Sequence, residues 1–235
     1  MSAWKAKRFW TKAEAEPCEG GFTVRLDGRP VKTPAKAALV VPTQAMAQAI
    51  AAEWDAQSGE VKPATMPVTR AANSAIDKIT AQRDEVVEII AAYGQSDLLC
   101  YRAVAPAALI ARQAAGWDPV LDWAEAALGA RLVVTAGVVH VAQPSDALAR
   151  LTARVAGMTE FQLAGLHDLV AISGSLVLAL AVTEGRLGDD EAWALSRIDE
   201  SWQIEQWGAD EEAAELEAFR RVAFGEASRF YALCG

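Results

Sequence analysis

The protein has 235 residues, of which 52% are hydrophobic and 23% are charged, a composition typical of globular rather than disordered proteins. Its net charge of −9 and pI of about 4.8 argue against nucleic acid and anionic membranes as partners. Three widely spaced cysteines without a CxxC pair argue against a disulfide framework and a zinc site, and they fit a reducing compartment.

The first forty residues favour β-structure. Residues 1–10 are basic but precede no apolar segment, so no signal peptide is expected. Residues 22–26 alternate in polarity, and Asp27-Gly28 is a strong hairpin signal. Residues 30–34 are expected to form the returning strand, and residues 38–41 another short strand.

The rest of the chain is expected to be mainly helical. Thr43 should cap a helix that runs to about Gln57, and two prolines in residues 60–67 mark a connector. Residues 131–141, a β-branched run around Gly137, should form two short strands or one bent strand. Seven further helices are expected, at Thr69–Ile79, Ala81–Tyr93, Pro106–Leu128, Ser145–Ala156, Glu160–Thr183, Asp189–Trp207 and Ala209–Leu233.

This order of elements predicts an α+β fold. A small N-terminal domain, residues 1–66, combines an antiparallel β-sheet with a helix, and a larger, mainly α-helical domain follows at residues 67–235. The most apolar run, residues 163–182, is long enough to span a membrane. Because His167 and Asp168 interrupt it, we expect a buried helix instead.

No sequence motif predicts catalysis. Dinucleotide, Walker A, HExxH, GxSxG and EF-hand patterns are absent. Ser173-Gly174-Ser175 lacks the leading glycine of a nucleophile elbow and should serve close helix packing. The two histidines, His140 and His167, lie in apolar runs and are expected in the core, and no metal site is predicted. Arg102 is expected to clamp the structure by pairing with Asp97 or a neighbouring acid.

One carboxylate cluster leaves an alternative open. Asp118, Asp122 and Glu125 share one face of a predicted helix, beside Trp117 and Trp123. Carboxylates flanked by tryptophan resemble the sites of sugar hydrolases, where two acids flank the scissile bond. The cluster could therefore belong to a hydrolase or a small-ligand-binding protein, or it could be a solvated helix face with tryptophans at its rim.

The most informative segment is residues 193–207, which holds three of the eight tryptophans. On a continuous helix, Leu195, Ile198 and Trp202 share one face, and Ile204 and Trp207 lie on nearly the opposite face together with Trp193. A helix with two apolar stripes is either buried on both sides or offers one side to a partner.

The same region carries most of the negative charge. Residues 184–217 hold two arginines and twelve acidic residues, a net charge of −10, whereas residues 1–36 carry +4. The acidic stretch either steers a basic partner towards the protein or is a solvated helix face.

Six motifs, in order along the chain, resemble those of the assembly chaperones that handle the α subunit of F1-ATPase in mitochondria and some bacteria. They run from about residue 8 to residue 224. They are Arg8-Phe9-Trp10, the run from Leu26 to Pro34, Glu53-Trp54-Asp55, Cys100-Tyr101-Arg102, Trp117-Asp118-Pro119, and Ser196-Arg197-Ile198-Asp199-Glu200 followed by Trp207-Gly208.

The resemblance implies a non-enzymatic chaperone without a cofactor. Such a chaperone would bind the unassembled F1 α subunit until the β subunit takes its place. The resemblance also implies that Asp199 is an acid important for activity. With the Trp-rich helix, it predicts a partner-binding site of Asp199, Glu200, Trp202, Glu205 and Trp207. A monomer is expected, in the bacterial cytoplasm or, for a processed eukaryotic form, the mitochondrial matrix. A scaffold protein with no client-folding role is a further alternative.

Overall fold

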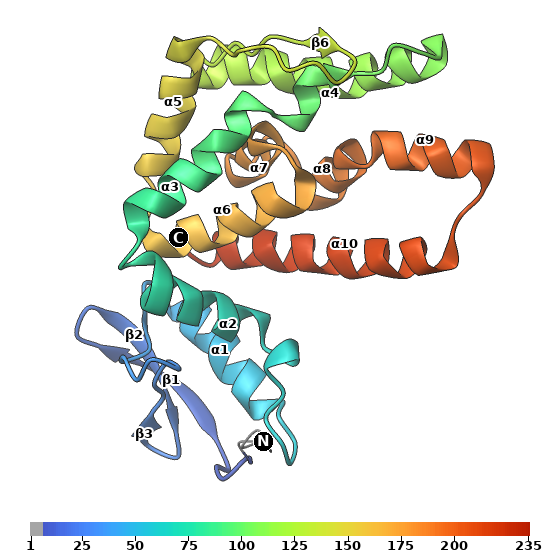
Figure 1. The fold of residues 1–235 in the computed structure, drawn as a ribbon. Coiled ribbons are helices and arrows are strands. Elements are labelled where there is room, and N and C mark those ends of the chain that lie inside the picture. The colour runs from blue at the N-terminus through green and yellow to red at the C-terminus, as the bar shows by residue number, and fades with distance from the viewer. Residues whose placement is uncertain (1–6) are drawn as a thin grey trace. The chain divides into compact units, whose positions relative to one another are not determined.

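A computed structural model describes residues 7–235 of the chain (Figure 1). Its contacts divide the chain into two compact units. The first unit extends to Arg83 and includes residues 159–165 and 229–235, and the second comprises residues 84–158 and 166–228. The predicted α+β class is confirmed, with a small antiparallel sheet near the N-terminus followed by a mostly helical chain. The domain boundary between residues 66 and 67 stays a prediction.

The sheet of the first unit is built around β2. Strand β2 (Gly21–Leu26) pairs antiparallel with β1 (Ala13–Cys18), with β3 (Arg29–Pro30) after the turn at residues 27 and 28, and with β4 (Val40–Val41). Alternation buries Val24 on one face, as predicted. Strand β1 was not predicted, because glutamates and a proline give its sequence little strand propensity.

Helix α1 (Gln44–Asp55) packs on β1 and β2 through Met46 and Ile50, which are fully buried. The predicted cap at Thr43 is confirmed, since its side chain accepts a hydrogen bond from the Met46 amide at 3.1 Å. A 3-10 turn (Pro63–Thr65), α2 (Pro67–Ser74) and one π-helical turn (Ala75–Ile79) follow.

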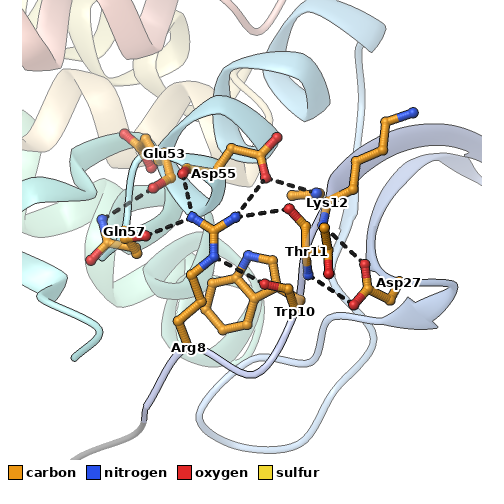
Figure 2. Close-up of polar contacts among 9 residues, drawn as sticks. Arg8, Trp10, Thr11, Lys12, Asp27, Glu53, Asp55 and Gln57 are labelled. Atoms are coloured by element: carbon orange, nitrogen blue, oxygen red, sulfur yellow. Dashed lines mark hydrogen bonds and ion pairs between the residues drawn. The ribbon is translucent and has the colours of Figure 1, made fainter. Parts of the chain in front are cut away.

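Figure 2 shows what holds the N-terminal segment in place. The Arg8 guanidinium donates to the backbone carbonyls of Trp10, Thr11, Asp55 and Gln57, at 2.6 to 3.0 Å. The Asp27 carboxylate accepts hydrogen bonds from the amides of residues 11 and 12, each at 2.9 Å. The N-terminal motifs therefore tie the strands to α1.

The second unit is mainly helical. Two 3-10 turns are Tyr93–Gln95 and Leu98–Cys100, and two short parallel strands are β5 (Tyr101–Arg102) and β6 (Thr135–Ala136). The remaining helices are α3 (Arg83–Ala92), α4 (Ala107–Leu128), α5 (Ser145–Ala156), α6 (Glu160–Ser173), α7 (Leu176–Thr183), α8 (Asp189–Ser196), α9 (Ile198–Trp207) and α10 (Glu211–Ala232).

Helix α7 forms the centre of this unit. All of its residues from Leu176 to Ala181 are fully buried, and α4 and α8 pack against it. The buried carboxylate of Asp97 holds its N-terminus, accepting hydrogen bonds from the Ser175 hydroxyl at 2.7 Å and the Val177 amide at 3.0 Å. Burial raises the pKa of Asp97, and these hydrogen bonds oppose that rise.

Two predicted helices are each divided in two. The helix expected at residues 160–183 breaks at Gly174, whose φ of +74° ends α6 before Ser175 caps α7. The helix expected at residues 189–207 breaks at Arg197, which has φ −114° and ψ 18°. The predicted pattern of faces along residues 193–207 is therefore wrong across that break.

Three further predictions are corrected. The run at residues 131–141 forms only the two-residue strand β6, because its partner β5 is equally short. Neither histidine lies in the core: both are exposed. His140 approaches the Tyr101 hydroxyl at 3.2 Å, and His167 contacts the Asp168 carboxylate at 3.0 Å, which raises the pKa of His167.

Across residues 7–235, no helix combines the length and apolar character that crossing a membrane would require. The apolar run at residues 163–182 instead contributes α6 and α7.

Candidate functional site

Asp199 lies in the first turn of α9, where it contacts α4. Its Oδ1 accepts a hydrogen bond of 2.6 Å from Nε2 of Gln113, a buried residue of α4. The Gln113 Oε1 in turn accepts a hydrogen bond from the Ala103 amide at 2.8 Å. Asp199 is half-buried, and its second oxygen accepts no hydrogen bond from residues 7–235. One oxygen therefore holds α9 on α4, and the other remains available.

Six residues later, α9 contacts α4 through an ion pair. Both Nη atoms of Arg112 donate to the carboxylate of Glu205, at 2.7 and 2.8 Å. The guanidinium also lies 4.9 Å from the ring centroid of Trp202, which is half-buried. The hydrogen bond from Arg112 lowers the pKa of Glu205. Asp199, Trp202 and Glu205 therefore share the face of α9 that packs on α4.

The break between α8 and α9 is held by stacking. Arg197 lies 5.2 Å from the ring centroid of Trp193 and forms an ion pair with Glu200 at 2.8 Å. Trp193 is buried and packs against Phe224 of α10, with ring centroids 5.9 Å apart. Trp193 is therefore a core residue, and Glu200 is paired with the residue that precedes its helix.

Trp207 differs from the other predicted site residues. It ends α9 with 79% of its surface exposed, and Ile204, three residues earlier, is 40% exposed. The structure thus brings together three of the five predicted site residues, Asp199, Trp202 and Glu205. It leaves Trp207 on a different face of the helix.

The carboxylate cluster on α4 does not form a paired acid site. Asp118 is bound to Arg102 at 2.8 Å, and Glu125 to Arg131 at 3.2 Å. The predicted clamp role of Arg102 thus finds its partner in Asp118 rather than Asp97. Trp117 is fully buried, and its indole donates to the Leu195 carbonyl at 2.8 Å. Within the described part of the chain, no cluster of three or more His, Cys, Asp or Glu could hold a metal ion.

The sequence did not reveal Arg112 and Gln113 as the partners of α9. They precede their acidic partners by 93 and 86 residues. The only signal was a lone amide among small and apolar residues in the predicted helix at 106–128, where a buried glutamine needs a polar partner.

Comparison with known proteins decides the family. The model of the ATP12 chaperone protein family matches residues 7–125, just over half of the chain. The chain belongs to the ATP12 chaperone family. The resemblance drawn from the six motifs is thereby confirmed, and so is the predicted role as an F1-ATPase assembly chaperone.

Individual relatives span nearly the whole chain. The mitochondrial protein atp12 of Schizosaccharomyces pombe is 26% identical over 223 residues, which cover 90% of this chain and 77% of that protein. The crystal structure of Atp12 from Paracoccus denitrificans is 49% identical, with a TM-score of 0.95 and coverage of 98% of this chain and 99% of that one. A point mutant of the Paracoccus protein matches at 48% identity, with a TM-score of 0.96 and coverage of 98% of both chains. The relatives thus include a mitochondrial and a bacterial ATP12 protein.

Proposed function

We propose that the protein binds the unassembled α subunit of F1-ATPase and covers its apolar interface until the β subunit replaces it. Membership of the ATP12 chaperone family supports this proposal. An unassembled subunit exposes apolar surface that its neighbour would cover, and such surface promotes aggregation. The family also implies a non-enzymatic role, in which the protein acts by binding alone and without a cofactor.

The observation that carries the proposed binding site is the arrangement of α9. One side is fixed to α4 by Gln113 and Arg112, and the other side leaves Trp207 exposed. A rigidly held helix loses little conformational entropy when it binds, and tryptophan is among the residues most enriched in binding hot spots. We propose that this helix contacts the client through five residues: Asp199, Glu200, Trp202, Glu205 and Trp207.

Within this proposal, Asp199 has two roles. Its bonded oxygen positions α9 through Gln113, and its second oxygen meets a donor of the client. Charged groups at an interface fix register and speed encounter. The protein would act as a monomer in the compartment where F1 is assembled, either the bacterial cytoplasm or the mitochondrial matrix.

The test measures aggregation of purified α subunit by light scattering. The protein should suppress aggregation in stoichiometric amounts, and Asp199→Asn should weaken the suppression. Because asparagine can still accept the hydrogen bond from Gln113, the free energy of unfolding of this variant should differ from that of the unaltered protein by no more than about 1 kcal/mol. Asp199→Lys should abolish suppression.

The matched control is Asp122→Asn, since Asp122 is an exposed acid of α4 that lies outside the proposed client-binding residues. It should suppress aggregation like the unaltered protein. If the unaltered protein fails to protect the α subunit, the proposed client is wrong. If Asp199→Asn protects fully, the charge of Asp199 does not contact the client.

A further inference from the structure

Several large apolar side chains of the C-terminal region are exposed on one helical hairpin. We call residues 204–222 the exposed hairpin; it comprises the end of α9, the turn at residues 208–210 and the first half of α10 (Figure 1). From Ile204 to Val222, every residue except Glu217 is exposed. Its large apolar side chains and their exposed fractions are Ile204 40%, Trp207 79%, Leu216 52%, Phe219 71% and Val222 61%.

The turn of this hairpin is well formed. Gly208 ends α9 with φ +88° and donates its amide to the Ile204 carbonyl at 2.8 Å. Asp210 caps α10, because its Oδ1 accepts a hydrogen bond from the Ala213 amide at 2.8 Å. The apolar side chains are therefore exposed on capped helices and not on an irregular loop.

One apolar face of α10 is buried towards the C-terminal end of the helix and exposed to solvent towards its N-terminal end. Leu216, Phe219, Ala223 and Ala227 follow at i, i+3, i+7 and i+11, which places them along one side of the helix. Ala227 is buried, with 6% of its surface exposed, Ala223 is half-buried, and Leu216 and Phe219 are mostly exposed. The apolar face that is buried at Ala227 thus continues to Leu216 and Phe219, where it is exposed to solvent.

The apolar residues at the end of α9 also lack cover. Ile204 and Trp207 lie three residues apart, on the side of α9 roughly opposite Ile198 and Trp202. Ile198 is buried and Trp202 stacks on Arg112. Both helices of the hairpin therefore carry apolar side chains that residues 7–235 leave largely or partly exposed, as at a protein-binding surface.

The charge around these side chains is mainly negative, and the two arginines of the hairpin, Arg220 and Arg221, lie at its end, where Arg221 is paired with Asp190. Residues 198–219 hold eight acidic residues and no lysine or arginine. Five of these acids lie in the turn and the first half of α10, and none forms an ion pair with another described residue. They are Asp210, Glu211, Glu212, Glu215 and Glu217. A bare apolar stripe edged by unpaired carboxylates is complementary to an apolar segment flanked by lysine or arginine.

We infer that the exposed hairpin is a docking surface for a basic, amphipathic segment of the client. This inference rests on the proposed function, and it adds the hairpin to the binding site and states the chemistry of the client segment. Leu216, Phe219 and Trp207 supply the apolar contact, and the carboxylates of the hairpin attract and orient the client's basic side chains.

A second copy of this chain fits the surface less well than a basic segment. Two hairpins facing each other would bring ten unpaired carboxylates together, and like charges at an interface oppose association. A basic client segment would meet no such repulsion, and its binding would weaken as salt screens the charges.

The experiment measures binding of purified F1 α subunit to three double variants of the full chain. The first, Leu216→Gln with Phe219→Gln, removes apolar contact with a residue that forms helix well. The second, Glu212→Gln with Glu215→Gln, removes two charges. The control, Val138→Ser with Val139→Ser, alters two valines outside the hairpin that are 93% and 72% exposed. Circular dichroism verifies folding, and Trp207→Gln replaces the first variant if it does not fold.

We expect the apolar variant to lose about tenfold or more in affinity. The charge variant should lose affinity at low salt but resemble the unaltered protein at about 0.5 M salt. The valine control should bind normally. Normal binding by both hairpin variants, or equal loss in the valine control, overturns the inference and leaves the proposed function standing.

Two other outcomes also oppose the inference. If the unaltered protein binds no α subunit, the proposed function fails and the assigned occupant fails with it. If sedimentation shows that the protein dimerises and that the apolar variant is monomeric, the hairpin binds a second copy of the chain instead.

Discussion

At the scale of single residues, Arg112 and Glu205 make the contact between α4 and α9 sensitive to pH. The hydrogen bond from Arg112 lowers the pKa of Glu205 in the folded protein. The pair therefore stabilises the fold fully above the pKa of an unfolded glutamate, about 4.3. Its contribution is lost as the pH falls through the lower pKa of the folded state, where Glu205 becomes protonated.

We therefore predict that Glu205→Gln lowers the free energy of unfolding near neutral pH. The difference from the unaltered protein should shrink as the pH falls below about 4.3. Urea unfolding over a series of pH values measures this difference. Glu215→Gln is the control, because Glu215 is exposed and unpaired within the described chain. If the difference in free energy of unfolding between Glu205→Gln and the unaltered protein stays constant at all pH values, the ion pair is not its cause.

The acids of α9 could be located from the sequence, but the α4 side chains that bind them could not. The resemblance to the family pointed to Asp199, and the structure finds it half-buried in the first turn of α9. Its partner Gln113 is 86 residues away in the chain, and no local pattern encodes a contact of that separation. No local pattern indicated that the two histidines would be exposed either. Both lie in apolar runs, and their apolar neighbours led to the prediction that they are buried.

At the scale of elements, the breaks in the two long helices differ in how predictable they were. Gly174 followed by Ser175 is a recognisable end and cap, so the division of residues 160–183 had a local signal. The break at Arg197 has neither glycine nor proline. It coincides with the stacking of Arg197 on Trp193, a contact within the folded chain that propensity does not reveal.

Close packing between elements gives a second prediction, at Gly165 in α6. A Cβ added there would lie 3.1 Å from the Cβ and 3.3 Å from the Cα of Tyr231, an atom of the α10 backbone. Gly165→Ala should therefore lower the free energy of unfolding by about 1–3 kcal/mol, although alanine favours helix.

The matched control is Gly225→Ala in α10. Its added Cβ would meet only the Asp189 side chain, at an ordinary 3.7 Å. Because alanine has the better helix propensity, this variant should gain up to about 1 kcal/mol. Thermal and urea unfolding measure both variants. Equal behaviour of the two variants would show that α6 and α10 do not approach as closely as the structure indicates.

At the scale of the whole molecule, several of the motifs that resemble the family hold the fold together. Arg8 and Asp27 join strands to α1, and Arg102 and Asp118 pair within the second unit. These motif residues are engaged in holding the fold. Their conformity to the family pattern explains why the α+β architecture was predictable. The exposed hairpin shares only Trp207-Gly208 with the motifs, and its apolar surface was not predicted.

Charge acts at the same scale. The net charge of −9 is concentrated in residues 184–217, which carry −10. A field of one sign over one region accelerates encounter with a partner of opposite charge. The sequence left open whether this stretch steers a partner or is a solvated face, and its unpaired acids beside exposed apolar side chains favour steering.

The proposed function requires that the protein hold the α subunit only until the β subunit arrives. The most direct measurement follows a complex of the protein with purified α subunit by size-exclusion chromatography while β subunit is added. We predict that free α subunit co-elutes with the protein and that assembled F1 does not. Added β subunit should release the protein as α and β associate. Failure of free α to co-elute, or equal binding of assembled F1, would contradict it.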